Sequence, residues 1–254
     1  MRTTLLAGLI LAALGGGAMA ATPASRFTQD PYPSTYRAIP AAPVLLANAT
    51  VLTGTGERLD GADVLLADGK VAAVGRGLSA PEGATRVDAT GKWVTPGLID
   101  VHSHLGVYPS PGASAHSDGN EAPSPVTAQV WAEHSIWPQA PGFHAALAGG
   151  LPSLQILPGS ANLVGGRGVT LKNVPSTTYQ GMKFPGAPWG LKMACGENPK
   201  RVYGGKSGPA TRMGNVAGYR AAFIDASEYL KKNAPKPQQP KKKRWWERAS
   251  GDDK

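Results

Sequence analysis

The sequence predicts an α/β protein in which a small β unit is followed by strands that alternate with helices. Short apolar runs separated by turn residues fill the segment from Val44 to Val74. Beyond residue 94, apolar runs of strand length alternate with segments of helical character. Because this alternation is typical of a parallel sheet or barrel, we expect one to follow the β unit.

The β unit contains a predicted hairpin. Asp68-Gly69 stands between two apolar runs, and this dipeptide in that setting is a strong hairpin signal. The segment from Trp93 to His104 follows the unit and is expected to form a buried strand. The strands expected before it cover residues 44–51, 62–67, 71–74 and 85–89.

The remaining elements are predicted from apolar periodicity and from residues that begin or end helices. Pro141 in a first turn and Gly149 after the last one define a predicted helix. A second, longer helix over 213–232 carries an apolar stripe that is expected to be core. The stripe consists of Met213, Val216, Phe223 and Leu230. The other expected elements are a helix over 126–136 and strands over 154–157, 169–174 and 190–194.

The two ends of the chain differ in composition from its body. Residues 1–20 combine Arg2, an apolar run too short to span a bilayer and an Ala18-Met19-Ala20 site, which predicts a signal peptide and export to the periplasm or the extracellular space. Residues 21–42 read as an extended leader. After the signal peptide, no stretch is apolar enough to span a membrane.

The charge of the chain is concentrated in its C-terminal tail. The formal net charge is +9, and residues 231–254 hold nine Lys or Arg against three acidic residues, a net +6. We interpret residues 233–254 as a basic disordered tail and expect no nucleic-acid partner, although Lys241 to Trp246 offers cations and two Trp rings that suit phosphates and bases. The single Cys195 excludes an intramolecular disulfide.

His102 and His104 are candidate metal ligands. Residues two apart on a strand point to the same side, so both imidazoles would project from one face, with Asp100 beneath them. Neutral imidazole is a good ligand for zinc. An isolated pair of this kind is more often structural, and the surrounding sequence decides between the two interpretations.

Residues 94–106, VTPGLIDVHSHLG, resemble the signature at the first barrel strand of the amidohydrolase superfamily, close to its imidazolonepropionase-related group. The resemblance extends upstream over residues 43–93 and, less distinctly, downstream over 140–232. It implies a small β-sandwich over 43–93 and the first part of a TIM-like (β/α)8 barrel over 94–232. The chain would then be an N-terminal portion of the family's fold.

The resemblance also implies a reaction and a site. Family members hydrolyse C–N bonds other than peptide bonds, in amides or cyclic amides of small molecules, through a water activated by one or two divalent metals, here expected to be zinc. His102 and His104 would be ligands, with carbamylated Lys192 or Glu197 as the third. Lys192 as a solvent-facing strand-end charge and Glu197 as a helix N-terminal acid are the alternatives. Arg167, in a Gly-rich loop, is a candidate for binding a substrate carboxylate.

The family's later ligands have no counterpart here, because no His follows His144 and the catalytic residues of the later strands are therefore unassigned. Only 157 residues follow Gly97, whereas a complete barrel needs about 250. The sequence thus predicts a truncated barrel, with a second chain as a possible source of the missing strands. The alternative is an inactive remnant or envelope binding protein of the same fold. His116, His134 and His144 are expected to be structural or solvent-facing.

Overall fold

The structure, a computed structural model, describes residues 30–108, 110–206 and 208–234. The predicted signal peptide, the first part of the leader and residues 235–254 of the tail lie outside these residues. Residues 30–227 form one compact unit, which is described below, and the described residues from Glu228 onward belong to a second. None of the helices in the described ranges combines the length and hydropathy that a membrane crossing requires.

The described chain combines strands with helices, which are interspersed with the strands after β6, and this confirms the α/β class. The strands are β1 (Val44–Leu52), β2 (Arg58–Ala67), β3 (Lys70–Gly75), β4 (Thr85–Asp88), β5 (Trp93–Val94), β6 (Ile99–Ser103), β7 (Ser153–Ile156), β8 (Val164–Arg167), β9 (Val169–Lys172) and β10 (Leu191–Met193). The α-helices are α1 (Pro141–Ala148), α2 (Tyr179–Met182), α3 (Glu197–Tyr203) and α4 (Arg212–Asn233), and the 3-10 turns are η1 (Ser114–His116) and η2 (Ala132–Ser135).

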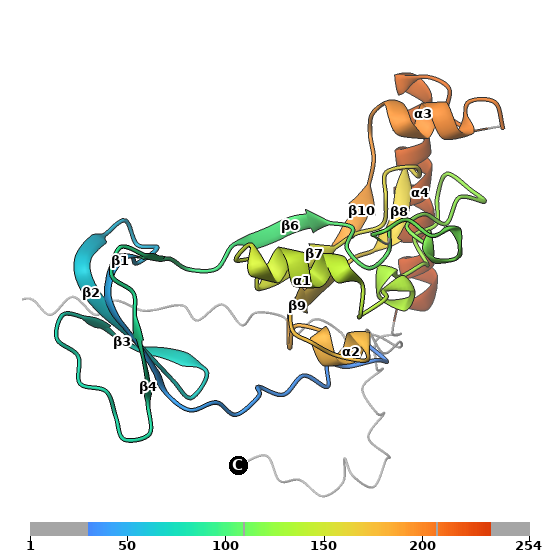
Figure 1. Cartoon of the computed structure of the whole chain (residues 1–254). Coiled ribbons are helices and arrows are strands. Elements are labelled where there is room, and N and C mark those ends of the chain that lie inside the picture. The colour runs from blue at the N-terminus through green and yellow to red at the C-terminus, as the bar shows by residue number, and fades with distance from the viewer. Residues whose placement is uncertain (1–29, 109, 207, 235–254) are drawn as a thin grey trace, which may run out of the picture. The chain divides into compact units, whose positions relative to one another are not determined.

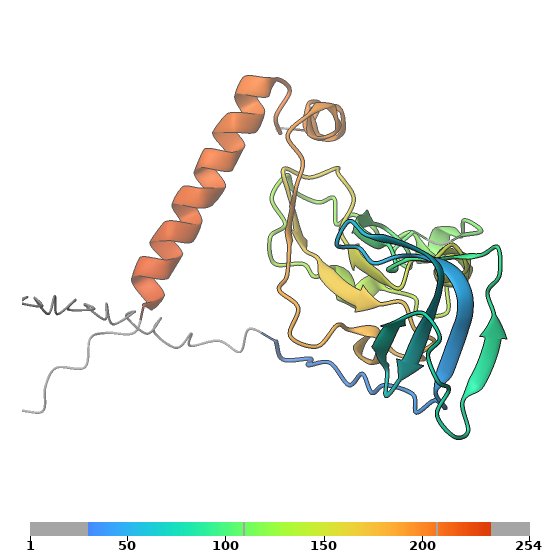
Figure 2. The ribbon, with the colours of Figure 1, turned by 90° about the vertical axis from the view of Figure 1, so that its left-hand side faces the viewer.

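The first five strands form one sheet in the order β3-β2-β1-β4, with β5 also paired to β1 (Figures 1 and 2). β1 pairs antiparallel with β2 and parallel with β4 and β5. Alternate residues of β1 are buried, and Ala62 and Val64 of β2 pack against them. The buried residues of β1 are Leu45, Ala47, Ala49 and Val51. Within the described residues these strands belong to one sheet, and the β-sandwich over 43–93 stays a prediction.

The hairpin predicted at Asp68-Gly69 is confirmed. The two residues connect β2 to β3 with φ values of 52° and 70°. A two-residue loop with positive φ at both positions matches the right-handed twist of the strands that it joins. Glycine is favoured at the second position because a Cβ disfavours this backbone conformation.

Replacing Gly69 with Ala is expected to lower the free energy of unfolding by roughly 1 to 2 kcal/mol. A Cβ at this position would meet no atom within 4 Å, so the cost comes from the backbone conformation alone. Gly205→Ala is a matched control, because its Cβ is equally unobstructed and its φ lies outside the left-handed region. Urea unfolding of the two variants measures the difference, and equal midpoints would contradict the turn assignment.

Two smaller sheets follow the first one. In one of them, the carboxyl ends of β6 and β7 lie side by side. β6 and β7 are parallel neighbours, and β9 pairs antiparallel with β7. β8 pairs antiparallel with β10 in a separate two-stranded sheet (Figure 1). The expectation of a parallel sheet therefore holds for the β6–β7 pair and is wrong for the β7–β9 and β8–β10 pairs. The link from β7 to β9 contains no helix, and parallel crossovers usually need one.

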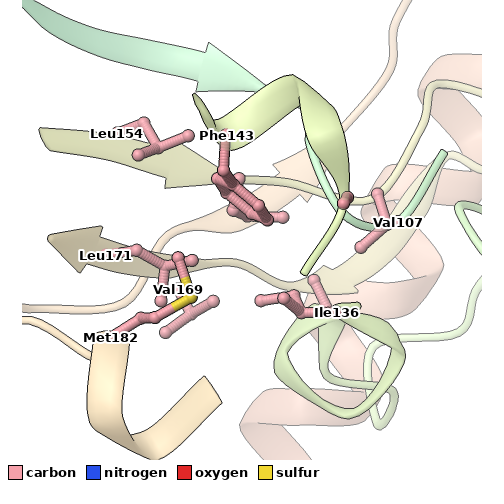
Figure 3. Packing of buried hydrophobic residues seen from close by; sticks show 10 residues of the cluster. Val107, Ile136, Phe143, Leu154, Val169, Leu171 and Met182 are labelled. Carbon is pink, nitrogen blue, oxygen red and sulfur yellow. The ribbon is translucent and has the colours of Figure 1, made fainter. Parts of the chain in front are cut away.

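The core of this region forms where α1, α2 and the β7–β9 pair meet. Phe143 of α1 and Met182 of α2 point toward the strand residues Leu154 and Leu171, as Figure 3 shows. All four side chains are at most 3% exposed. α1 begins with Pro141 at its first turn and ends before Gly149, as predicted.

Two predictions about this region are wrong. The segment 126–136 is not a helix, apart from the short turn η2, because Val126 and Trp131 form β-bridges with Val164 and Arg167 of β8. Pairing with β8 thus uses backbone groups that a helix would bond internally. The strand β6 is not buried, since it lies at the edge of its sheet and Ile99 is 70% exposed.

The helix α4 is confirmed, but its apolar stripe is not core. Met213, Val216, Phe223 and Leu230 are between 56% and 79% exposed. Instead, two residues of α4 contact the rest of the unit. Asn215 is buried and donates to the carbonyl of Gly196, and Gly218 packs against Leu163. Small side chains allow this close approach, and they lie on a different face from the stripe.

The leader residues 30–36, called the docked leader below, lie extended along the segment 179–183. Asp30 Oδ1 is 2.7 Å from Lys183 Nζ, and Ser34 Oγ donates to the carbonyl of Lys183 at 2.6 Å. The Thr35 N–H donates to the carbonyl of Gln180. Contacts of side chain and backbone together therefore hold this part of the leader in place.

Candidate metal centre

The two candidate ligands lie together at the carboxyl end of β6. His102 is in the strand and His104 directly follows it, with ring centroids 5.2 Å apart in an edge-to-face arrangement. Asp100 Oδ1 accepts a hydrogen bond from the backbone N–H of His102 at 2.9 Å, which fixes the strand backbone before the pair. The structure thus brings together the two imidazoles that the H-x-H spacing predicted.

A backbone carbonyl orients the ring of His104. Its Nδ1 lies 2.8 Å from the carbonyl oxygen of Leu157, which follows β7. Because a carbonyl can only accept, Nδ1 carries a proton, and in the neutral ring this tautomer leaves the lone pair on Nε2. Metal-bound histidines characteristically donate their other ring N–H in this way. The parallel pairing of β6 and β7 positions this carbonyl, since Leu157 N donates to Ser103 O.

Lys192 of β10 reaches the same place. Its side chain is buried, and its Nζ lies 3.0 Å from His102 Nε2. Burial lowers the pKa of Lys192. The charge of Lys192, followed by desolvation and the charge of His104, lowers the pKa of His102. The alternative in which Lys192 extends into solvent is therefore wrong.

Glu197 is engaged elsewhere. It lies in the first turn of α3, and its carboxylate is 2.7 Å from Lys200 Nζ with the side chain 74% exposed. Lys200, through a hydrogen bond and its charge, lowers the pKa of Glu197. This position is that of a helix N-terminal acid, the alternative considered for it.

Arg167 is held within an ionic and aromatic cluster. Its guanidinium carbon lies 3.3 Å from the ring centroid of Trp131 and 4.4 Å from that of Trp189. Its Nη2 is 3.2 Å from Glu133 Oε1, and Glu133 Oε2 is 3.0 Å from Lys183 Nζ. Glu133 thus already gives Arg167 a carboxylate partner from this chain.

Sequence reasoning did not identify a pocket beside His104. The pocket has a volume of about 200 Å³ and is lined, among others, by Tyr108, Ser160, Asn198 and Arg201. Tyr108 packs its ring edge-to-face with that of His104, at 5.6 Å between centroids. The sequence did contain a signal for this pocket. Ser160 follows the predicted strand 154–157, and polar residues that follow barrel strands collect at the carboxyl ends of the strands, where active sites form.

The other histidines lie outside this arrangement. His116 is tilted against Trp137 at 5.0 Å, and His134 packs against Tyr32 at 5.3 Å between ring centroids. His144 is exposed on α1. Within the described ranges, no group of three His, Cys, Asp or Glu side chains is placed to hold a metal.

Three similarities to known proteins bear on the family of this chain. No family model matches the chain. The amidohydrolase tasK of Hapsidospora irregularis is 37% identical over 183 residues, 67% of this chain and 19% of the relative. The dihydroorotase of Citrifermentans bemidjiense is 36% identical over 107 residues, 42% of this chain and 20% of that protein.

A solved structure gives the fold-level comparison. The crystal structure of an amidohydrolase from Thermotoga maritima MSB8 superposes with a TM-score of 0.68 at 46% identity, over 74% of this chain and 49% of that one. The chain thus shares its fold with a solved amidohydrolase. The chain belongs to the amidohydrolase superfamily. It spans about half the length of the solved relative and about a fifth of the two curated relatives.

Proposed function

We propose that this chain carries the N-terminal metal-binding portion of an amidohydrolase that hydrolyses a C–N bond in a small amide or cyclic amide. The observation that carries the proposal is the meeting of His102, His104 and Lys192 at the carboxyl end of β6. The shared family and the names of the relatives support the reaction class. We further propose that the region from residue 94 onward corresponds to part of a (β/α)8 barrel.

The residues present fit a divalent metal, with zinc as the expected ion. His104 has its Nδ1 proton directed to a carbonyl, so Nε2 is available as a ligand. His102 directs Nε2 toward Lys192. A bound cation would supply Lewis acidity, which lowers the pKa of water and polarises an amide oxygen.

Lys192 fits the third position better than Glu197 does. Burial favours its neutral amine, and a neutral amine can add carbon dioxide to give a carbamate and a released proton. The new N–C bond converts the neutral amine into an anionic carbamate with oxygen ligands, which suits a site next to two imidazoles. Glu197, by contrast, would have to give up its ion pair with Lys200 to become a metal ligand.

Zinc uptake by the full chain after chelator treatment tests this assignment. We expect Lys192→Met to bind markedly less zinc than the wild type, and we expect wild-type uptake to rise when bicarbonate is supplied. Glu197→Gln is the matched control and should bind as the wild type does. Wild-type zinc content in Lys192→Met, with its far-ultraviolet circular dichroism unchanged, would sink the assignment.

A further inference from the structure

The pocket beside His104 has the chemistry of a site for a small anion. Its described lining residues include Arg201, Asn198, Ser160 and Tyr108, and none of them carries a carboxylate. Glu197, which lies one turn before Arg201 on α3, is paired with Lys200. The positive charge of Arg201 therefore dominates the pocket, which favours a negatively charged occupant.

Hydrogen bonds hold Arg201 and Ser160 in a fixed relation. Asn198 Nδ2 donates to Ser160 Oγ at 2.6 Å, and Arg201 Nη2 donates to Asn198 Oδ1 at 3.2 Å. Ser160 accepts in this bond, so its own O–H remains able to donate into the pocket. A guanidinium has five N–H donors, and the bond to Asn198 uses one of them.

Gly159 also lines the pocket. A Cβ at this position would overlap Asn120 Oδ1 and the Tyr108 hydroxyl, which are joined by a hydrogen bond of 2.7 Å. Glycine therefore lets the loop after β7 approach these two side chains closely. Because Tyr108 donates to Asn120, its hydroxyl oxygen can still accept a hydrogen bond.

The size of the pocket limits the occupant to a small group. A volume of about 200 Å³ corresponds to roughly seven water molecules at ~30 Å³ each. A carboxylate with a short aliphatic stem fits this space, and a guanidinium binds the planar carboxylate through two parallel hydrogen bonds.

We infer that this pocket binds the carboxylate of the substrate, with Arg201 and Ser160 as donors, so that the substrates are small N-acyl amino acids. The pocket borders His104, which places the amide of such a molecule on the side of the histidine pair. This inference rests on the proposed function for the identity of the reacting bond. The binding of the acid itself depends only on the pocket.

Calorimetric titration of the full chain tests the inference with N-acetyl-L-alanine and its neutral analogue N-acetyl-L-alaninamide. We expect the acid to bind and the amide to bind at least about 10-fold more weakly, because charge-assisted hydrogen bonds are lost. Arg201→Met should weaken binding of the acid by about 10-fold or more and leave the amide unchanged. Arg220→Met, which removes an exposed guanidinium on α4, is the matched control and should bind the acid as the wild type does.

Several results would overturn the inference. These are equal binding of acid and amide, full affinity in Arg201→Met, no binding of the acid at millimolar concentration, or inorganic phosphate binding as tightly as the acid. Failure of the proposed function has a different signature. If the chain takes up no zinc but still binds the acid more tightly than the amide through Arg201, the metal centre is contradicted and the anion pocket is supported.

Discussion

Replacing Glu133 with Gln is expected to lower the free energy of unfolding by about 3 to 5 kcal/mol. The Glu133 side chain is 1% exposed and lies within 3.2 Å of Arg167 and 3.0 Å of Lys183. A neutral amide of the same shape would leave two cations near one another without the carboxylate between them. Urea unfolding, followed by tryptophan fluorescence, measures the loss.

An exposed ion pair supplies the control. Glu228 and Lys231 lie 2.7 Å apart on α4, with side chains 65% and 72% exposed. Water screens such a pair, so Glu228→Gln is expected to change stability by less than about 1 kcal/mol. Equal losses of unfolding free energy in Glu133→Gln and Glu228→Gln would show that the buried Glu133 ion pairs stabilise the fold no more than an exposed pair does.

Removal of either imidazole is expected to weaken zinc binding on the order of 100-fold or more. Substitution of a residue that merely supports a metal ligand costs about 10- to 100-fold in affinity, and loss of the ligand itself should cost at least as much. His102→Ala and His104→Ala are the variants, and competition with a chromophoric chelator gives their dissociation constants.

The exposed His144 on α1 is the matched control for these variants. His144→Ala should bind zinc with wild-type affinity. Circular dichroism must accompany the His104 variant, because that residue also bonds to Leu157 O. Affinities equal to the wild type in both His102→Ala and His104→Ala would remove the metal centre from the proposal.

Local signals were the ones that predicted structure correctly. The Asp68-Gly69 turn and the helix that begins at Pro141 each depend on backbone preferences of a few residues, and both are present. The proximity of His102 and His104 follows from their spacing within one segment. Such features need no knowledge of the rest of the fold.

Features that depend on distant partners were not predictable in the same way. Lys192 and His102 are 90 residues apart, and the sequence alone could not separate Lys192 from Glu197 as a ligand. The sequence predicts a helix over 126–136, and nothing in the pattern of this segment shows that it pairs with β8 instead. The α4 stripe has helical spacing, but spacing does not determine which face meets the unit.

The pocket residues illustrate a further reason. Arg201 and Ser160 belong to different elements, and only the folded chain connects them through Asn198. Neither residue stands in a motif that the sequence marks as functional. Their proposed role follows from the fact that both residues line the same pocket as His104.

The docked leader has a consequence for the order of folding. Its contacts join residues 149 to 153 positions apart, between Ser34 or Asp30 and Lys183, whereas the β2–β3 hairpin closes across two residues. The entropic cost of closing a loop rises with its length, by about 0.6 kcal/mol for each doubling. We therefore expect the hairpin to form before the leader closes onto the segment 179–183.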